Sequence, residues 1–178
     1  GAHGDFHLIV LAPNSVQEMH DHVALGFDLA FKYRNPAMIL ADGAIGQMME
    51  KVVLAPQRPR KTNEEIAEEC KEWAACGKGN RKERNIITSL ELQSEVMEKI
   101  NQRLQAKYKA LEENEVRYEA INCDDADYVI VAFGSSARIC SATVELARAE
   151  GLKVGLLRPI TLYPFPSKVI ADLAKRGV

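Results

Sequence analysis

The chain has 178 residues, of which 47% are hydrophobic and 27% are charged, and its formal net charge is -2. This length can bury one core of ordinary size or two small ones. The balance of 23 basic against 25 acidic residues indicates no surface for nucleic acid or anionic membrane, and no apolar run approaches the roughly 20 residues that span a bilayer. The beginning of the sequence has no signal-peptide pattern. We therefore expect a cytoplasmic protein with neither a membrane nor a nucleic-acid partner.

A first βαβ unit is predicted over residues 6–41. Residues 6–12 are almost continuously apolar, as in a buried parallel strand. Ser15 and Glu18 have capping-box spacing, in which the serine caps a helix and the glutamate reaches back to the serine N–H. A second apolar strand follows Pro36, which ends the helix. The residues expected to form the buried helix face are Val16, Met19, Val23, Phe27 and Ala30.

Two histidines on this helix, His20 and His22, invite a metal site. Residues two apart on a helix point about 200° from each other, so the two rings cannot chelate one ion. We expect both to be solvated helix-face residues. The four cysteines match no zinc or iron–sulfur spacing and are interpreted as reduced thiols. No metal ligand is assigned in this chain.

The segment 42–50 follows the second strand at its carboxyl end, the edge at which ligands bind in open α/β sheets. Its glycines allow a close backbone approach. The pattern fits either a plain loop or the lip of a binding site, for which Asp42, Gly43 and Gln47 are the candidate residues.

Residues 56–120 are predicted to be a linker that contains a long helix. Proline, glycine and charged residues dominate the part up to about 84, which is typical of a linker. A long amphipathic helix is predicted from 91 to about 118. Its apolar positions are Val96, Met97, Ile100, Leu104, Tyr108 and Leu111.

A second βαβ unit is predicted over residues 128–157, followed by a final helix from about Ser167. Gly134, Ser135 and Ser136 should form the strand-to-helix turn and its N-cap, and Gly151 should end the helix. Each half of the chain shows only two strands, fewer than the usual four to six of a sheet. We therefore expect the sequence to be a fragment.

The turn at Gly134–Ser136 resembles a phosphate-binding corner, because a helix N-terminus presents free N–H groups. The Gly-x-Gly-x-x-Gly pattern is absent, however, and Arg158 rather than an acid ends the following strand, where it could suit a 2′-phosphate. No histidine follows Ser136, so a serine triad is incomplete. A structural corner is the first interpretation and a dinucleotide site the second.

Five segments together resemble a known family. They are residues 12–18, 30–36, 40–50, 131–138 (Val-Ala-Phe-Gly-Ser-Ser-Ala-Arg) and 157–166 (Leu-Arg-Pro-Ile-Thr-Leu-Tyr-Pro-Phe-Pro). In this order they closely resemble the alpha-type subunit of thiamine-diphosphate-dependent 2-oxoacid:ferredoxin oxidoreductases, particularly the 2-oxoisovalerate branch. The resemblance covers nearly the whole chain.

The resemblance implies an α/β fold made of two incomplete three-layer parallel-sheet domains. Residues 1–55 would end a transketolase-like pyrimidine-binding domain, and 56–120 would be the linker with its long helix. Residues 121–178 would begin a transketolase C-terminal-like domain. Asp42, Gly43 and Gln47 become candidates beside the cofactor cleft, and Gly134–Ser136 a structural turn.

The implied reaction is oxidative decarboxylation of a branched-chain 2-oxo acid with coenzyme A, giving an acyl-CoA and reduced ferredoxin. Thiamine diphosphate would stabilise the carbanion. Its pyrophosphate and magnesium would be held by a partner subunit, and the iron–sulfur clusters would lie in another. The expected partners are beta-, gamma- and ferredoxin-type subunits and ferredoxin itself. The family's activating glutamate and substrate loop would precede Gly1, so no catalytic residue is assigned and this segment alone should be inactive. A dinucleotide-binding module and a non-catalytic assembly domain are the alternatives.

Overall fold

The computed structural model describes residues 6–75, 77–79 and 83–178. Its contacts divide it into two compact units, one of residues up to Leu54 with Gln105–Val178 and the other of Ala55–Leu104. The α/β class predicted from the sequence is confirmed. The elements are β1 (Ile9–Leu11), α1 (Val16–Tyr33), β2 (Ala37–Ile39), α2 (Gly43–Gln47), α3 (Asn63–Glu69), α4 (Ser94–Asn114), β3 (Tyr118–Ile121), β4 (Tyr128–Val131), α5 (Gly134–Ala149), β5 (Val154–Pro159), β6 (Thr161–Tyr163) and α6 (Ser167–Lys175).

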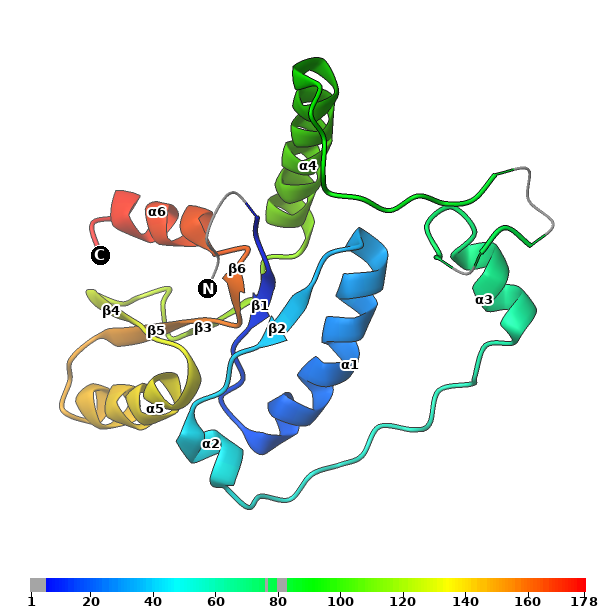
Figure 1. The fold of residues 1–178 in the computed structure, drawn as a ribbon. Helices are drawn as coiled ribbons and strands as arrows, with labels where there is room; N and C mark the ends of the chain where they lie inside the picture. The colour runs from blue at the N-terminus through cyan, green and yellow to red at the C-terminus, as the bar shows by residue number, and fades with distance from the viewer. Residues whose placement is uncertain (1–5, 76, 80–82) are drawn as a thin grey trace. The chain divides into compact units, whose positions relative to one another are not determined.

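The first predicted βαβ unit is confirmed and forms what we call the β1 sheet, with strand order β2-β1-β6 (Figure 1). β1 and β2 pair in parallel, with Ile9 opposite Ala37, and α1 packs on both strands. β6 pairs antiparallel with β1 and was not predicted. Apolar residues buried at this sheet and helix include Ile9, Leu11 and Leu29.

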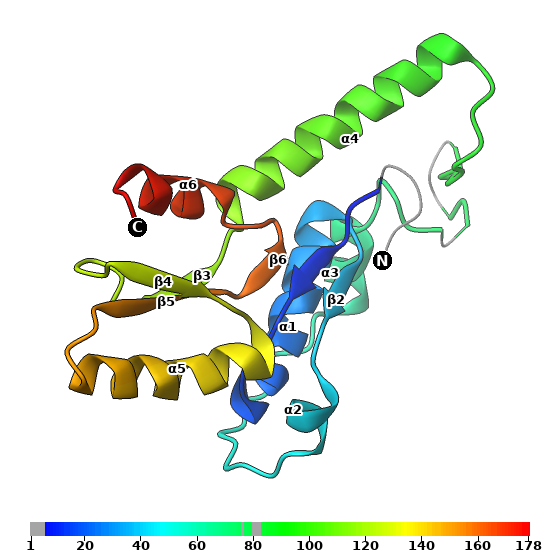
Figure 2. The same ribbon diagram turned by 90° about the vertical axis from the view of Figure 1, so that its left-hand side faces the viewer.

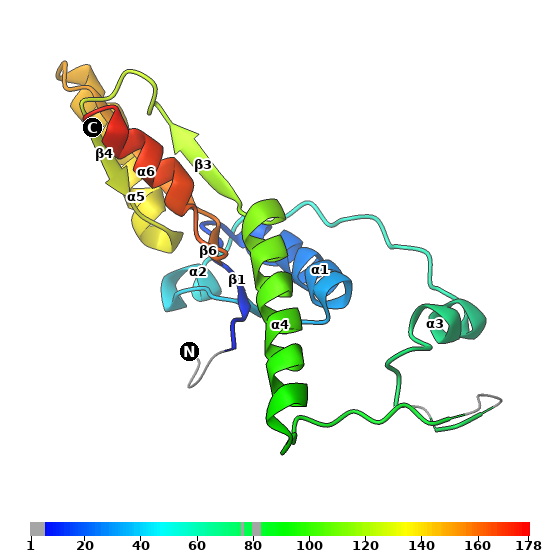
Figure 3. The same cartoon turned by 90° about the horizontal axis from the view of Figure 1, so that it is seen from above.

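The second predicted βαβ unit is also confirmed and forms the β5 sheet, with strand order β3-β5-β4. β4 and β5 are parallel, whereas the unpredicted β3 is antiparallel to β5 and runs on from the end of α4 (Figure 3). Helices α5 and α6 cover opposite faces of this sheet, as the two side views agree (Figures 1 and 2). Helix α5, the β5 sheet and helix α6 therefore form three layers.

One stretch of chain serves both sheets, because β5 and β6 are separated by Ile160 alone. The Ile160 carbonyl accepts the Ala12 N–H at 2.8 Å, and the Ile160 N–H donates to the Arg117 carbonyl at 2.9 Å. A buried carboxylate adds a second connection, since Glu115 accepts from Lys32 at 2.6 Å and from the Tyr33 hydroxyl at 2.7 Å. The two sheets thus belong to one unit.

The buried face of α1 differs from the predicted one. Phe27 is 65% exposed and Val23 is also exposed, whereas His22, Gly26 and Leu29 are buried. The reason is the absence of a side chain at Gly26, where a Cβ would lie 3.3 Å from the Ile39 side chain. The helix approaches β2 at this glycine, and Val23 and Phe27 face outward.

The prediction that His22 is solvated was wrong. Its side chain is 7% exposed, and its Nδ1 has no hydrogen-bond partner among the described residues. Burial lowers the pKa of His22 below 6.5. His20, by contrast, keeps a third of its side chain exposed and contacts Asp21.

The helix ends follow the predicted signals closely. Ser15 caps α1 by accepting the Glu18 N–H at 3.1 Å. The predicted return bond from Glu18 goes instead to the Asn14 N–H, at 3.0 Å, so the capping box is shifted by one residue. Gly151 has φ +88° and closes α5 through a Schellman pair, its N–H on the Arg148 carbonyl and that of Leu152 on Ala147.

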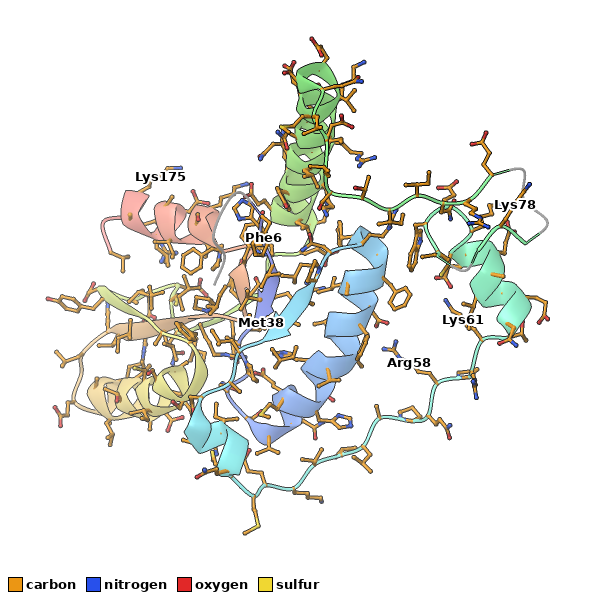
Figure 4. All side chains as sticks on the ribbon, viewed as in Figure 1. Phe6, Met38, Arg58, Lys61, Lys78 and Lys175 are labelled. Atoms are coloured by element: carbon orange, nitrogen blue, oxygen red, sulfur yellow. The ribbon has the colours of Figure 1, made fainter. Side chains whose placement is uncertain are left out.

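The other unit contains α3 and the first part of α4, and the sequence analysis placed no helix at α3. Thr62 and Glu65 form a complete capping box there, and Lys61, which Figure 4 labels, pairs with Glu69. The predicted long helix is confirmed as α4, although it ends at Asn114. The described cysteines at 70, 123 and 140 are free thiols, and Cys76 lies outside the described residues. No helix in the described part of the chain is long and apolar enough to cross a membrane. The predicted domain boundaries stay a prediction.

Candidate cofactor-cleft wall

A cavity of about 450 Å³ opens where the carboxyl ends of β2 and β4 meet. The two strands belong to different sheets, and the sequence places its candidate residues after the carboxyl end of each. The structure brings together Asp42 and the turn Gly134–Ser136, which are more than 90 residues apart in the sequence. The lining residues are Leu40, Ala41, Asp42, Val131, Ala132, Phe133, Gly134, Ser135 and Ser136.

The Asp42 carboxylate joins two helix N-termini in the wall of this cavity. One oxygen accepts the Ile45 N–H at 2.9 Å and caps α2, and the other accepts the Ser135 N–H at 3.1 Å in the first turn of α5. Hydrogen bonds from Ser135 and from the Ile45 N–H lower the pKa of Asp42 from 3.8 to about 2. The carboxylate therefore stays charged at neutral pH and compensates the positive end of α5.

The turn before α5 needs glycine at position 134. Gly134 has φ +60°, a left-handed conformation that side chains disfavour. The predicted serine cap is absent, because Phe133 is the N-cap residue and makes no side-chain hydrogen bond. Asp42 of a different segment takes that role, which a search for local capping residues could not find.

The other two predicted lip residues do not line this cavity. Gly43 begins α2 and Gln47 ends it, and both are exposed. Their part in a cofactor cleft stays a prediction.

The geometry does not favour the dinucleotide interpretation. Arg158, the residue considered for a 2′-phosphate, is buried and bonded to carboxylates. Its side chain is 4% exposed, its Nη atoms donate to Glu18 at 2.8 and 2.9 Å, and its Nε donates to Glu119 at 2.8 Å. The N-terminus of α5, the other phosphate candidate, already holds the Asp42 carboxylate. Neither group is free to bind a phosphate.

A second charged pair joins α5 to the segment after α2 and was missed in the sequence. Arg138 in the first turns of α5 pairs with Glu50 and donates to the Asn14 carbonyl at 3.4 Å. Glu50 also accepts the Val16 N–H at 3.1 Å. Val16 begins α1, where a backbone N–H has no carbonyl partner within the helix. Opposite charges so far apart in sequence give no local signal.

Comparison with known proteins places the chain in a family. Residues 2–120 match the family described as "Pyruvate flavodoxin/ferredoxin oxidoreductase, thiamine diP-bdg". Residues 126–177 match "Pyruvate:ferredoxin oxidoreductase core domain II". The chain belongs to the pyruvate flavodoxin/ferredoxin oxidoreductase family. The family resemblance recognised in the sequence is thereby confirmed.

Individual relatives agree with this family. The chain is 49% identical over 177 residues to the ketoisovalerate oxidoreductase subunit VorB of Methanothermobacter marburgensis, covering 99% of this chain and 48% of the relative. It is 32% identical over 194 residues to the 2-oxoglutarate synthase subunit KorA of Methanocaldococcus jannaschii, covering 100% of this chain and 53% of the relative. The chain thus spans about half the length of these relatives.

A solved structure shares the fold. The 2-oxoglutarate:ferredoxin oxidoreductase from Magnetococcus marinus matches with a TM-score of 0.72 and 20% identity, over 97% of this chain and 34% of that one. At this identity the match supports the α/β fold alone.

The family implies thiamine diphosphate, and the lining residues fit only part of it. A diphosphate with its metal needs cations or several carboxylates, but the cavity lining carries one carboxylate and no cationic side chain. No cluster of three metal-binding side chains occurs among the described residues. The diphosphate end therefore does not fit this wall. Leu40, Val131 and Phe133 offer an apolar surface suited to a neutral group.

Proposed function

We propose that the protein to which this chain belongs oxidatively decarboxylates a branched-chain 2-oxo acid with coenzyme A and passes the electrons to ferredoxin. The observation that carries this proposal is the 49% identity to a ketoisovalerate oxidoreductase subunit across 99% of the chain. Relatives named for 2-oxoglutarate are less similar, at 32% identity or below among those compared.

Within that enzyme we assign this chain one wall of the cofactor cleft. The support is the cavity of about 450 Å³ at the carboxyl ends of β2 and β4, with Asp42 and Gly134–Ser136 in its lining. Since this wall lacks cations, thiamine diphosphate would be held at its diphosphate end, with magnesium, by another subunit. The iron–sulfur clusters and the ferredoxin contact also belong to beta-, gamma- and ferredoxin-type partners in this proposal, and the complex is cytoplasmic.

The test is reconstitution of the complete subunit with its partner subunits. The purified complex, supplied with thiamine diphosphate, magnesium and coenzyme A, should reduce an electron-accepting dye only when a 2-oxo acid is added. Mass spectrometry should detect the acyl-CoA that has lost one carbon. An assembled complex that reduces no dye with any 2-oxo acid would support the non-catalytic assembly domain instead.

A further inference from the structure

Arg158 is a buried cation that connects the two sheets. It lies on β5, and its planar guanidinium binds Glu18 of α1 through two parallel hydrogen bonds and Glu119 of β3 through a third. Glu119 is its cross-strand neighbour within the β5 sheet. The Glu18 contact, by contrast, reaches the helix packed on the β1 sheet. Such fork-to-carboxylate pairs fix orientation as well as distance.

The Glu18 carboxylate also holds the loop after β1, at Pro13–Asn14. Its Oε2 accepts both the Arg158 guanidinium, at 2.9 Å, and the Asn14 N–H, at 3.0 Å. The Gly134 turn lies against the same loop, since a Cβ at Gly134 would be 3.9 Å from the Pro13 carbonyl oxygen and 3.5 Å from the Asp42 carboxylate. The loop is therefore held on one side by Glu18 and contacts the cavity-lining turn on the other.

The Arg138–Glu50 link at the same loop is more exposed. Arg138, which pairs with Glu50, is 44% exposed, so water and salt weaken that pair. Arg158 is enclosed, and a buried guanidinium left without a carboxylate is strongly unfavourable. The Arg158–Glu18 contact is therefore an enclosed ion pair whose carboxylate also holds the Asn14 N–H.

We propose that Arg158 is a positioning residue of the oxidoreductase, which through Glu18 fixes the loop that supports the Gly134 turn in the cavity wall. This inference rests on the proposed function for its catalytic consequence. The structural part, that Glu18 and Arg158 together hold the turn, can be measured whether or not the enzyme is active.

The experiment uses two matched substitutions on the same guanidinium in the complete, assembled protein. Glu18→Gln weakens the contact between sheets, and Glu119→Gln weakens the contact within the β5 sheet. Hydrogen–deuterium exchange is measured for the peptide containing the Ser135 amide. Glu18→Gln should raise exchange there about tenfold, the loss expected for one charge-assisted hydrogen bond, and Glu119→Gln should not. Peptides of β5 should stay protected in both.

The charge-conserving variant Arg158→Lys provides the rescue. A lysine keeps one ion pair but not the two parallel hydrogen bonds to Glu18, whereas Arg158→Met removes the charge altogether. The exchange rate at Ser135 in Arg158→Lys should therefore lie between those of wild type and Arg158→Met. In the active complex, Glu18→Gln should lower kcat/KM for the 2-oxo acid more than Glu119→Gln does. Equal exchange in the two glutamine variants, or none above wild type, overturns the proposal even if Arg158→Met fails to fold. If Glu18→Gln raises Ser135 exchange and Glu119→Gln does not, but the complex is inactive, the result counts against the proposed function alone.

Discussion

The Asp42 carboxylate accepts the Ser135 N–H at 3.1 Å, across 93 positions of sequence. This bond joins the segment after β2 to the start of α5 and places a negative charge at the positive end of that helix. The cavity wall is therefore assembled from two distant segments. Neither segment can form it alone.

Asp42→Ala tests whether the start of α5 depends on the Asp42 carboxylate. The change removes the cap of α2 and the carboxylate at α5 together, so exchange at the Ser135 amide should rise and the thermal midpoint should fall. Asp42→Asn should lie between, because an amide oxygen can still accept one bond. Asp172→Asn is the control, since that exposed carboxylate pairs with Lys175 of its own helix. Equal behaviour of the Asp42 and Asp172 variants would contradict the role given to Asp42.

Gly134→Ala should destabilise the chain by about 1–2 kcal/mol, because position 134 has φ +60° and a side chain disfavours that conformation. Space is not the obstacle, since the new Cβ would meet the Asp42 oxygen at an ordinary 3.5 Å. Urea unfolding measures the change. Gly46→Ala in α2 is the matched control, with nothing within 4 Å of the new Cβ, and it should be neutral or stabilising by about 0.5 kcal/mol. A stabilising Gly134→Ala would show that the turn has a different conformation.

The two faces of α1 should differ in how much stability a truncation removes. Leu29 is 3% exposed, so Leu29→Ala should cost roughly 2–5 kcal/mol by leaving a cavity against the β1 sheet. Phe27→Ala at the exposed face should change the stability of this chain by less than about 1 kcal/mol. Urea unfolding of both variants checks the assignment. If Phe27→Ala loses more stability than Leu29→Ala, Phe27 lies on the buried face of α1, as the sequence predicted.

Protonation of His22 should weaken the fold below neutral pH. Burial and the nearby Arg158 lower its pKa below 6.5, whereas Glu18 and Asp21 act in the opposite direction. The unfolded chain therefore binds a proton more readily than the folded one, and stability should fall as the pH drops from 6.5 through the folded pKa of His22. His22→Gln should reduce the pH dependence of the unfolding free energy over this range. A slope retained in His22→Gln would place its origin in another group.

The sequence predicted the local features of this fold well. Parallel strands, the helix between them, the Ser15 cap and the Gly151 terminator all depend on neighbouring residues, and all are present. The strands β3 and β6 were missed because each pairs antiparallel with a strand that lies far away in sequence. The buried face of α1 was wrong because hydrophobic spacing gave no weight to Gly26, where the helix meets Ile39.

The candidate site was predicted in part. The strand-end rule singled out Asp42 after β2 and Gly134–Ser136 after β4, and these two segments line the same cavity. It could not show that Asp42 caps α5, or that Arg158 turns inward to Glu18, because both depend on how the two sheets meet. Arg158, which the second interpretation considered for a 2′-phosphate, is an interior ion-pair partner.

The most direct test of the account compares substrates on the reconstituted complex. Steady-state dye reduction should be measured side by side with 2-oxoisovalerate, pyruvate and 2-oxoglutarate at saturating coenzyme A. The account predicts the highest kcat/KM for 2-oxoisovalerate, by about tenfold or more over pyruvate, since filling an apolar pocket with extra methyl groups is worth that much. A higher kcat/KM for 2-oxoglutarate, or no reduction with any of the three, would contradict it.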